Sequence, residues 1–261
     1  MFKLIEDSDV RSLRSLPLHL YNLNFLFDKS KIQFDKKLSP LLVATFLGKI
    51  EVIHLLLSNE CLNINLASEN EGYTPLMVAL YNGHYEVTKL LLDKGADINI
   101  ITKSGHYPIL FCFSRLEEEN YKYENMTLCM LLIELMLVKG ADLNKRVDNN
   151  IGYSILMKLL SVEINEEESF QTTFKIIKFL MERGADKSVT TFNNQSVYDV
   201  IKEGKYKGEL MELIKNTTQI YFFENYKNSN NKNTNYNKSL ESSNQILLED
   251  SSIRTNCCII F

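Results

Sequence analysis

Residues that could carry enzymatic chemistry are scattered along this sequence. The four histidines are His19, His54, His84 and His106. None belongs to a His-Glu-x-x-His pattern, and no glycine-rich phosphate loop or Gly-x-Ser-x-Gly elbow occurs. The acidic runs at 117–119 and 166–168 lie among polar residues, where no evident pocket would shift the pKa of a carboxyl group. We therefore expect no enzyme, and no metal, cofactor or small-molecule substrate.

Cysteine is the other reactive residue type. Three of the five cysteines are isolated, without a Cys-x-x-Cys pair: Cys61, Cys112 and Cys129. Isolated thiols of this kind are typical of a reducing compartment and argue against a disulfide framework or a zinc site. The other two cysteines stand together near the end of the sequence, which closes with the letters CCIIF.

Those last residues resemble a prenylation signal. Cys258 precedes Ile259, Ile260 and Phe261, the order of a cysteine, two aliphatic residues and a terminal residue. The resemblance implies a lipid on Cys258, and phenylalanine in the last place favours geranylgeranyl. Because one lipid often anchors only reversibly, we expect a second on Cys257, either palmitate or another prenyl group. An unmodified, accidental ending is the alternative.

Composition and charge limit the remaining classes. The chain of 261 residues is 45% hydrophobic and 24% charged, which is the composition of a globular protein. Its formal net charge of -4 argues against a nucleic-acid binder. The start, MFKLIEDSDV, turns acidic too early for a secretory signal, and no apolar run approaches the ~20 residues of a membrane helix. We expect a cytoplasmic protein, peripheral on the cytosolic face of a membrane if Cys258 is prenylated.

The middle of the sequence contains an internal repeat. Its clearest copy is EGYTPLMVALYNGHYEVTKLLLDKGADIN, residues 71–99. The triplet Gly-Ala-Asp recurs at 95–97, 140–142 and 184–186, each time after an apolar helical run. A hydroxyl residue that can cap a helix precedes four of the five predicted inner helices: Ser39, Thr74, Ser154 and Ser196. Tyr107 precedes the remaining one.

These units resemble ankyrin repeats. Residues 72–99 follow that family's pattern nearly throughout, and the 33 residues from Pro75 to Pro108 equal its period. The resemblance implies an all-α solenoid of helix-turn-helix repeats joined by β-hairpin loops. Eight of the ten glycines fall where the repeat needs a turn or a left-handed helix end: Gly48, Gly72, Gly83, Gly95, Gly105, Gly140, Gly152 and Gly184.

We therefore divide the chain into three parts. Residues 1–35 form an N-terminal helical capping segment, and residues 36–215 form about five repeats, the last of them degenerate. Acidic insertions at 115–125 and 162–171 are predicted to be long loops, or alternatively a contact site for a basic partner. Residues 216–261 are rich in asparagine and serine, a composition typical of a disordered tail.

The resemblance also indicates where a partner would bind. In the family, the third and sixth residues after the proline point toward a concave face. Here the predicted partner-binding residues form an apolar stripe: Val43, Phe46, Val78, Tyr81 and Phe111. We expect a non-catalytic scaffold or adaptor that binds a protein and is held at a membrane. The alternatives are a secreted effector of an intracellular bacterium, prenylated by its host, and a ubiquitin-ligase adaptor with a degenerate F-box-like segment at 16–34.

Overall fold

The computed structural model describes residues 1–16, 23–24, 27–28, 37–114, 116, 126–147 and 150–217. The chain divides into two compact units, Met1–Gln219 and Ile220–Phe261. The predictions made for the second unit, including lipidation of Cys257 and Cys258, lie outside the described residues. The insertion at 115–125 lies outside them as well, apart from Leu116, and so does most of the F-box-like segment.

The chain begins with two short helices, α1 (Phe2–Glu6) and α2 (Val10–Ser15). The Asp9 carboxylate caps α2 by accepting a hydrogen bond of 2.9 Å from the Ser12 amide, and hydrogen bonding from Ser12 lowers the pKa of Asp9. Two residues of strand β1 (Phe27–Asp28) then pair antiparallel with β2 (Lys37–Leu38), with Phe27 opposite Leu38. The first pair of helices packs on the next pair, α1 on α3 and α2 on α4.

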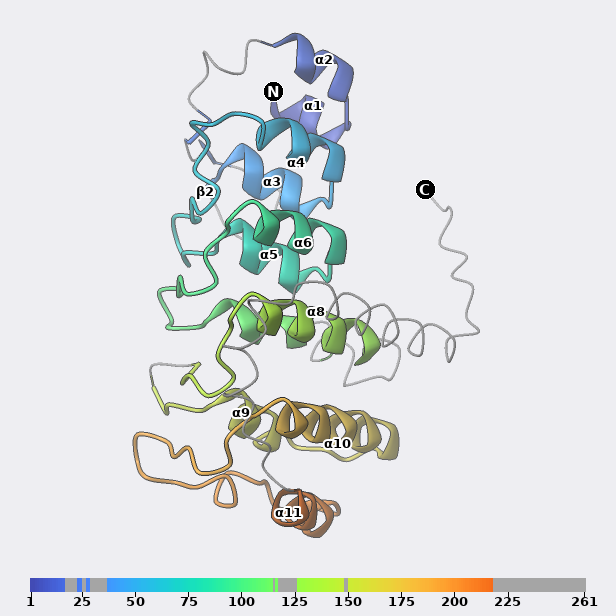
Figure 1. Ribbon diagram of the computed structural model, residues 1–261, viewed down its shortest axis with the longest axis vertical. Coiled ribbons are helices and arrows are strands. Elements are labelled where there is room, and N and C mark those ends of the chain that lie inside the picture. The colour runs from blue at the N-terminus through green and yellow to red at the C-terminus, as the bar shows by residue number, and fades with distance from the viewer. Residues whose placement is uncertain are drawn as a thin grey trace, which may run out of the picture. The chain divides into compact units, whose positions relative to one another are not determined.

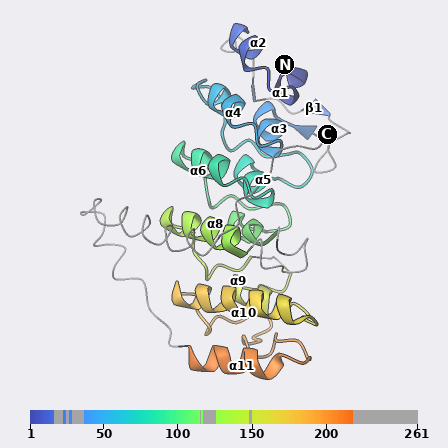
Figure 2. The ribbon, with the colours of Figure 1, turned by 90° about the vertical axis from the view of Figure 1, so that its right-hand side faces the viewer.

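Four helix pairs follow. Their bounds are α3 (Pro40–Phe46) with α4 (Ile50–Leu56), α5 (Pro75–Tyr81) with α6 (Tyr85–Asp93), the 3₁₀ helix η2 (Pro108–Phe113) with α8 (Met126–Val138), and α9 (Ile155–Leu160) with α10 (Glu167–Glu182). Helix α11 (Lys207–Asn216) comes last. Within this unit the pairs stack in chain order (Figure 1). In Figure 2 the inner helices α3 and α5 form one layer and the outer helices α4 and α6 a second.

Hydroxyl caps start three of the inner helices, as the sequence predicts. The side chain of Ser39, Thr74 or Ser154 accepts a hydrogen bond from the amide three residues later. Tyr107 has no side-chain oxygen within reach, and the element after it is 3₁₀ rather than α. The prediction for Ser196 is wrong, because residues 197–200 form a turn and Ser196 instead bonds the Asp199 carboxylate.

Glycine geometry confirms the turn assignments made from the sequence. All eight predicted glycines have positive φ, a conformation that disfavours side chains. At Gly48 a second reason applies, since an added Cβ would lie 3.0 Å from the His84 ring. The Nε2 atom of His84 lies 3.2 Å from the Phe46 carbonyl oxygen, so this histidine joins neighbouring repeats.

One continuous apolar core runs through the described repeats. The second insertion corrects our expectation of a loop over 162–171, because α10 begins at Glu167. The Phe170 ring stacks on the Tyr206 ring at 4.1 Å, and the Tyr206 hydroxyl donates to Glu167. With these contacts, α10 begins more than one turn earlier than the expected loop allowed, and only residues 162–166 form a loop. Hydrogen bonds from Gln171 and Tyr206 lower the pKa of Glu167.

Candidate functional site

The predicted apolar stripe is mostly core. Val43 and Val78 are fully buried, and Phe111 is only 8% exposed. The prediction of an open stripe is therefore wrong for these three residues. Phe46 and Tyr81 are half-buried at the ends of α3 and α5, and their role as partner contacts stays a prediction.

Packing between neighbouring inner helices explains this burial. Helix α5 is buried from Pro75 through Leu80, because α3 and η2 lie on either side of it and α6 behind it. Phe111 packs edge-on against Tyr73 at 5.6 Å and against His106 at 6.5 Å. A short helix enclosed in this way has no free side, so its third position after the proline faces protein.

The most exposed large apolar side chains belong instead mainly to the hairpin loops between repeats. We call residues 57–74, 94–107, 139–154 and 183–196 the first to fourth hairpins. Ile101 of the second is 43% exposed, Ile151 of the third 39% and Phe192 of the fourth 53%. Sequence reasoning missed them, although an isoleucine or phenylalanine beside Asn and Gly in a loop was a visible signal.

Asparagine side chains link successive hairpins. The Asp97 amide donates to the Asn65 Oδ1 at 2.9 Å, and the Asp186 amide donates to the Asn144 Oδ1 at 2.7 Å. The second and third hairpins are joined differently. There the Asn99 Oδ1 accepts from the Lys145 Nζ at 2.7 Å.

The third hairpin also brings two cations beside an open groove. Lys145 lies over the Tyr107 ring with its Nζ 4.9 Å from the centroid. Arg146 donates to the Thr190 carbonyl at 3.1 Å, and its guanidinium lies 5.1 Å from the Phe192 ring centroid. A groove of about 590 Å³ is lined by Tyr107, Lys145 and Arg146 and by residues 188–190 of the fourth hairpin.

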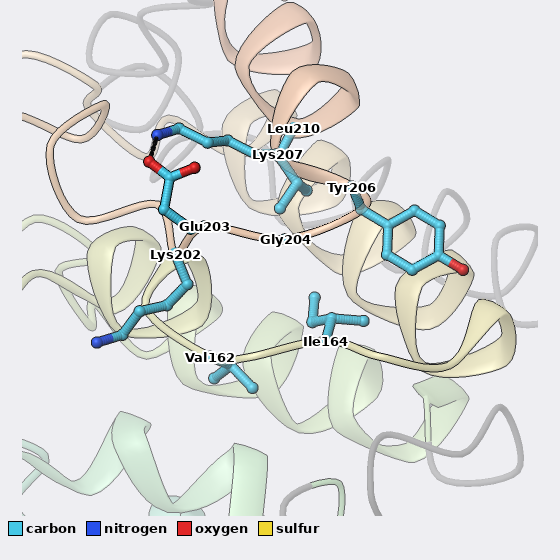
Figure 3. Close-up of a pocket in the computed structure, with 8 residues that line it drawn as sticks. All are labelled: Val162, Ile164, Lys202, Glu203, Gly204, Tyr206, Lys207 and Leu210. Atoms are coloured by element: carbon cyan, nitrogen blue, oxygen red, sulfur yellow. Dashed lines mark hydrogen bonds and ion pairs between the residues drawn. The ribbon is translucent and has the colours of Figure 1, made fainter.

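A second hollow lies where the 162–166 loop meets the last repeat. Figure 3 shows Val162 and Ile164 opposite the segment that carries Tyr206, with Glu203 and Lys207 forming an ion pair. The space left is about 10 Å³, on the order of one water molecule. This hollow is therefore too small for a ligand larger than about one water molecule.

Two of the cysteines, Cys112 and Cys129, are buried. Burial raises the pKa of the Cys112 and Cys129 thiols, which keeps both protonated and poor as nucleophiles. No group of three or more metal-ligating side chains occurs in the part of the chain that the structure describes. Over the same residues, no helix is long and apolar enough to cross a membrane.

Comparison with known proteins agrees with this architecture. A family model described as ankyrin repeats in three copies matches residues 14–102. Among solved structures, the chain is similar to the ankyrin repeat domain of Bcl-3, described as a unique member of the IkappaB protein family. The likeness has 20% sequence identity and a TM-score of 0.52 and covers 68% of each chain. A search of curated proteins gave no match.

Ankyrin repeats generally mediate protein–protein interaction, and the fold is typically a non-enzymatic module. Among the described residues, the exposed large apolar side chains lie mainly on the hairpins, whereas the inner helices are mostly buried. The repeats, the family model and the structural likeness together establish an ankyrin-repeat fold for this chain.

Proposed function

We propose that this protein is a non-catalytic scaffold that binds a protein partner through its repeats and is held at a membrane by a prenyl group on Cys258. The observation that carries the binding part is the exposure of large apolar side chains on hairpins that are hydrogen-bonded into the stack. Exposed apolar patches on ordered elements are typical of interaction surfaces.

The membrane part is supported by the terminal residues alone. A transferase forms a thioether between the Cys258 sulfur and the prenyl carbon, with diphosphate leaving from the prenyl donor. The reaction requires Phe261 to carry the free carboxylate, which the intact mass of the purified protein checks directly. Because a single lipid anchors reversibly, Cys257 is the proposed second attachment point.

Membrane fractionation in eukaryotic cells tests this part. Wild type should sediment with membranes, Cys258→Ser should become largely soluble, and Cys257→Ser should fall between them. Cys61 is an exposed thiol in the first hairpin, so Cys61→Ser is the matched control and should behave as wild type. Equal distribution of wild type and Cys258→Ser would remove the membrane part and leave the scaffold part standing.

Proximity labelling tests the scaffold part. Labelled proteins should include a set that is lost when Phe46 and Tyr81 are both replaced by alanine, with the urea midpoint showing that the fold persists. We expect that set on the cytosolic side of the membrane. If the double variant keeps the wild-type set, the predicted concave contacts play no part in binding.

A further inference from the structure

Phe192 is exposed yet held in place. Its backbone amide donates to the Ile151 carbonyl at 2.9 Å, which fixes the fourth hairpin against the third. A Cβ added at Gly152 would lie 2.8 Å from the ring, so the ring rests directly on that backbone. With Arg146 on the ring as well, this phenylalanine loses little conformational freedom on binding, which is how preorganised contacts gain affinity.

The two cations beside it lack acidic partners among the described residues. Arg146 contacts the Thr190 carbonyl and the Phe192 ring, and Lys145 contacts the Asn99 Oδ1 atom and the Tyr107 ring. All of these groups are neutral. Four other cations of the described repeats do have acidic partners, in the bridges Lys139–Asp93, Arg183–Glu134, Lys205–Glu167 and Lys207–Glu203.

The groove beside these cations has one acidic lining residue, Asp142. The Asp142 carboxylate already accepts a hydrogen bond of 2.8 Å from the Asn144 amide. Lys145 and Arg146 therefore leave an excess of one positive charge along the groove, next to the exposed Phe192 and Ile151. A partner with carboxylates and an apolar side chain matches both properties.

We propose that the third and fourth hairpins form a docking site for an acidic peptide segment that carries a large apolar residue. The apolar side chain packs against Phe192 and Ile151, and the neighbouring carboxylates meet Arg146 and Lys145. Arginine and aromatic side chains are the types that dominate interface energetics, and here they lie side by side. This inference rests on the proposed protein-binding function and names the chemistry of the partner.

Phage display of short random peptides on the immobilised full-length protein tests the proposal. The selected peptides should be enriched in Asp and Glu around a Leu, Ile or Phe. A synthetic peptide from that selection should lose about 10-fold or more in affinity for Phe192→Ser and for Arg146→Glu. Arg146→Lys should retain part of the affinity because it keeps the positive charge. It should lose the rest because lysine lacks the planar guanidinium group, which can donate two parallel hydrogen bonds to a carboxylate.

Matched controls carry the same changes elsewhere. Arg11→Glu alters an exposed arginine on α2, and Tyr198→Ser removes another exposed aromatic ring, so both should bind as wild type. Urea unfolding of each variant shows whether the fold persists. Affinity should also fall as salt rises toward about 0.5 M, since the cations are partly open to solvent.

Four outcomes overturn the docking site. Selection of basic or purely apolar peptides contradicts the charge argument, and so does selection of none. Peptides that bind Phe192→Ser and Arg146→Glu as tightly as wild type occupy another surface, which leaves the proposed scaffold function intact. The last outcome combines two results: no acidic peptide is selected, and a fluorescent oligouridylate binds wild type but not Arg146→Glu. That outcome assigns the site to single-stranded RNA.

Discussion

The second and third repeats share one plan and differ in how they begin. Thr74 caps α5 with its hydroxyl, and α5 is a regular α-helix. Tyr107 stands at the equivalent position of the third repeat, supplies no cap, and is followed by a 3₁₀ helix. Its ring instead lies under Lys145. At this position the second repeat has a side chain that caps its own helix, and the third has a ring that contacts a surface cation.

The links between hairpins differ in the same way. Where Asn144 bridges to the next hairpin, its carboxamide both accepts from the Asp186 amide and donates to the Gly184 carbonyl. The Asn99 side chain instead accepts a hydrogen bond from the Lys145 side chain. The links at Asn65 and Asn144 bond backbone groups of the next hairpin and so hold the stack together. The link at Asn99 bonds the Lys145 side chain at the surface instead. The proposed docking site begins at this irregular junction.

Burial differs most strongly between Phe111 of η2 and Phe192 of the fourth hairpin. Phe111→Ala removes a core ring and should lower the free energy of unfolding by about 3–5 kcal/mol. Phe192→Ala removes an exposed ring and should cost about 1 kcal/mol or less, mainly the contact with Arg146. Urea unfolding followed by circular dichroism measures both. Equal losses would mean that Phe192 belongs to the core and cannot serve as a docking anchor.

Local geometry could be predicted from the sequence, because a turn or a cap depends on one or two residue types. Gly95 and Thr74 are such cases, and both adopt the predicted conformation or contact. Burial could not be predicted in the same way. Whether Val78 faces solvent depends on how closely the next inner helix packs, and that distance is not encoded in the helix itself.

The candidate docking site was even less accessible to sequence reasoning. The letters KR at 145–146 show two cations, but their neutral partners come from residues about 40 positions away on either side. The start of α10 was missed for a related reason. Residues 167–171 are polar enough to suggest a loop, and only the stacking of Phe170 on the distant Tyr206 shows why they are helical.

Gly140 and Gly152 lie near the two ends of the third hairpin, and both have positive φ. Gly140→Ala meets only backbone strain, because nothing lies within 4 Å of an added Cβ, and it should cost about 1–2 kcal/mol. Gly152→Ala adds a clash with the Phe192 ring and should cost more. Combining Gly152→Ala with Phe192→Ala should recover the excess in a double-mutant cycle. Additive losses would show that the ring does not rest on Gly152.

The asparagine links test whether regular junctions hold the stack. Asn144→Ala leaves the Asp186 amide and the Gly184 carbonyl without their side-chain partner and should cost about 1–3 kcal/mol. Asn99→Ala removes one exposed contact to Lys145 and should change stability by about 0.5 kcal/mol at most. Chemical unfolding of the two variants side by side measures the difference, and a larger loss for Asn99→Ala would reverse the comparison.

Substitutions at the helix starts should have small effects on stability, of about 1 kcal/mol or less. Thr74→Ala should lower the free energy of unfolding by about 1 kcal/mol, since it deletes the hydroxyl that caps α5. Tyr107→Thr should add a cap of similar worth to η2, but it removes the ring beneath Lys145, worth about 0.5–1 kcal/mol. The two terms nearly cancel, so stability should stay within about 0.5 kcal/mol of wild type while affinity for the selected acidic peptide falls. If Tyr107→Thr instead destabilises the protein by as much as Thr74→Ala, the tyrosine is required for the third repeat to fold, and the exchange of a cap for a surface contact is the wrong account of this junction.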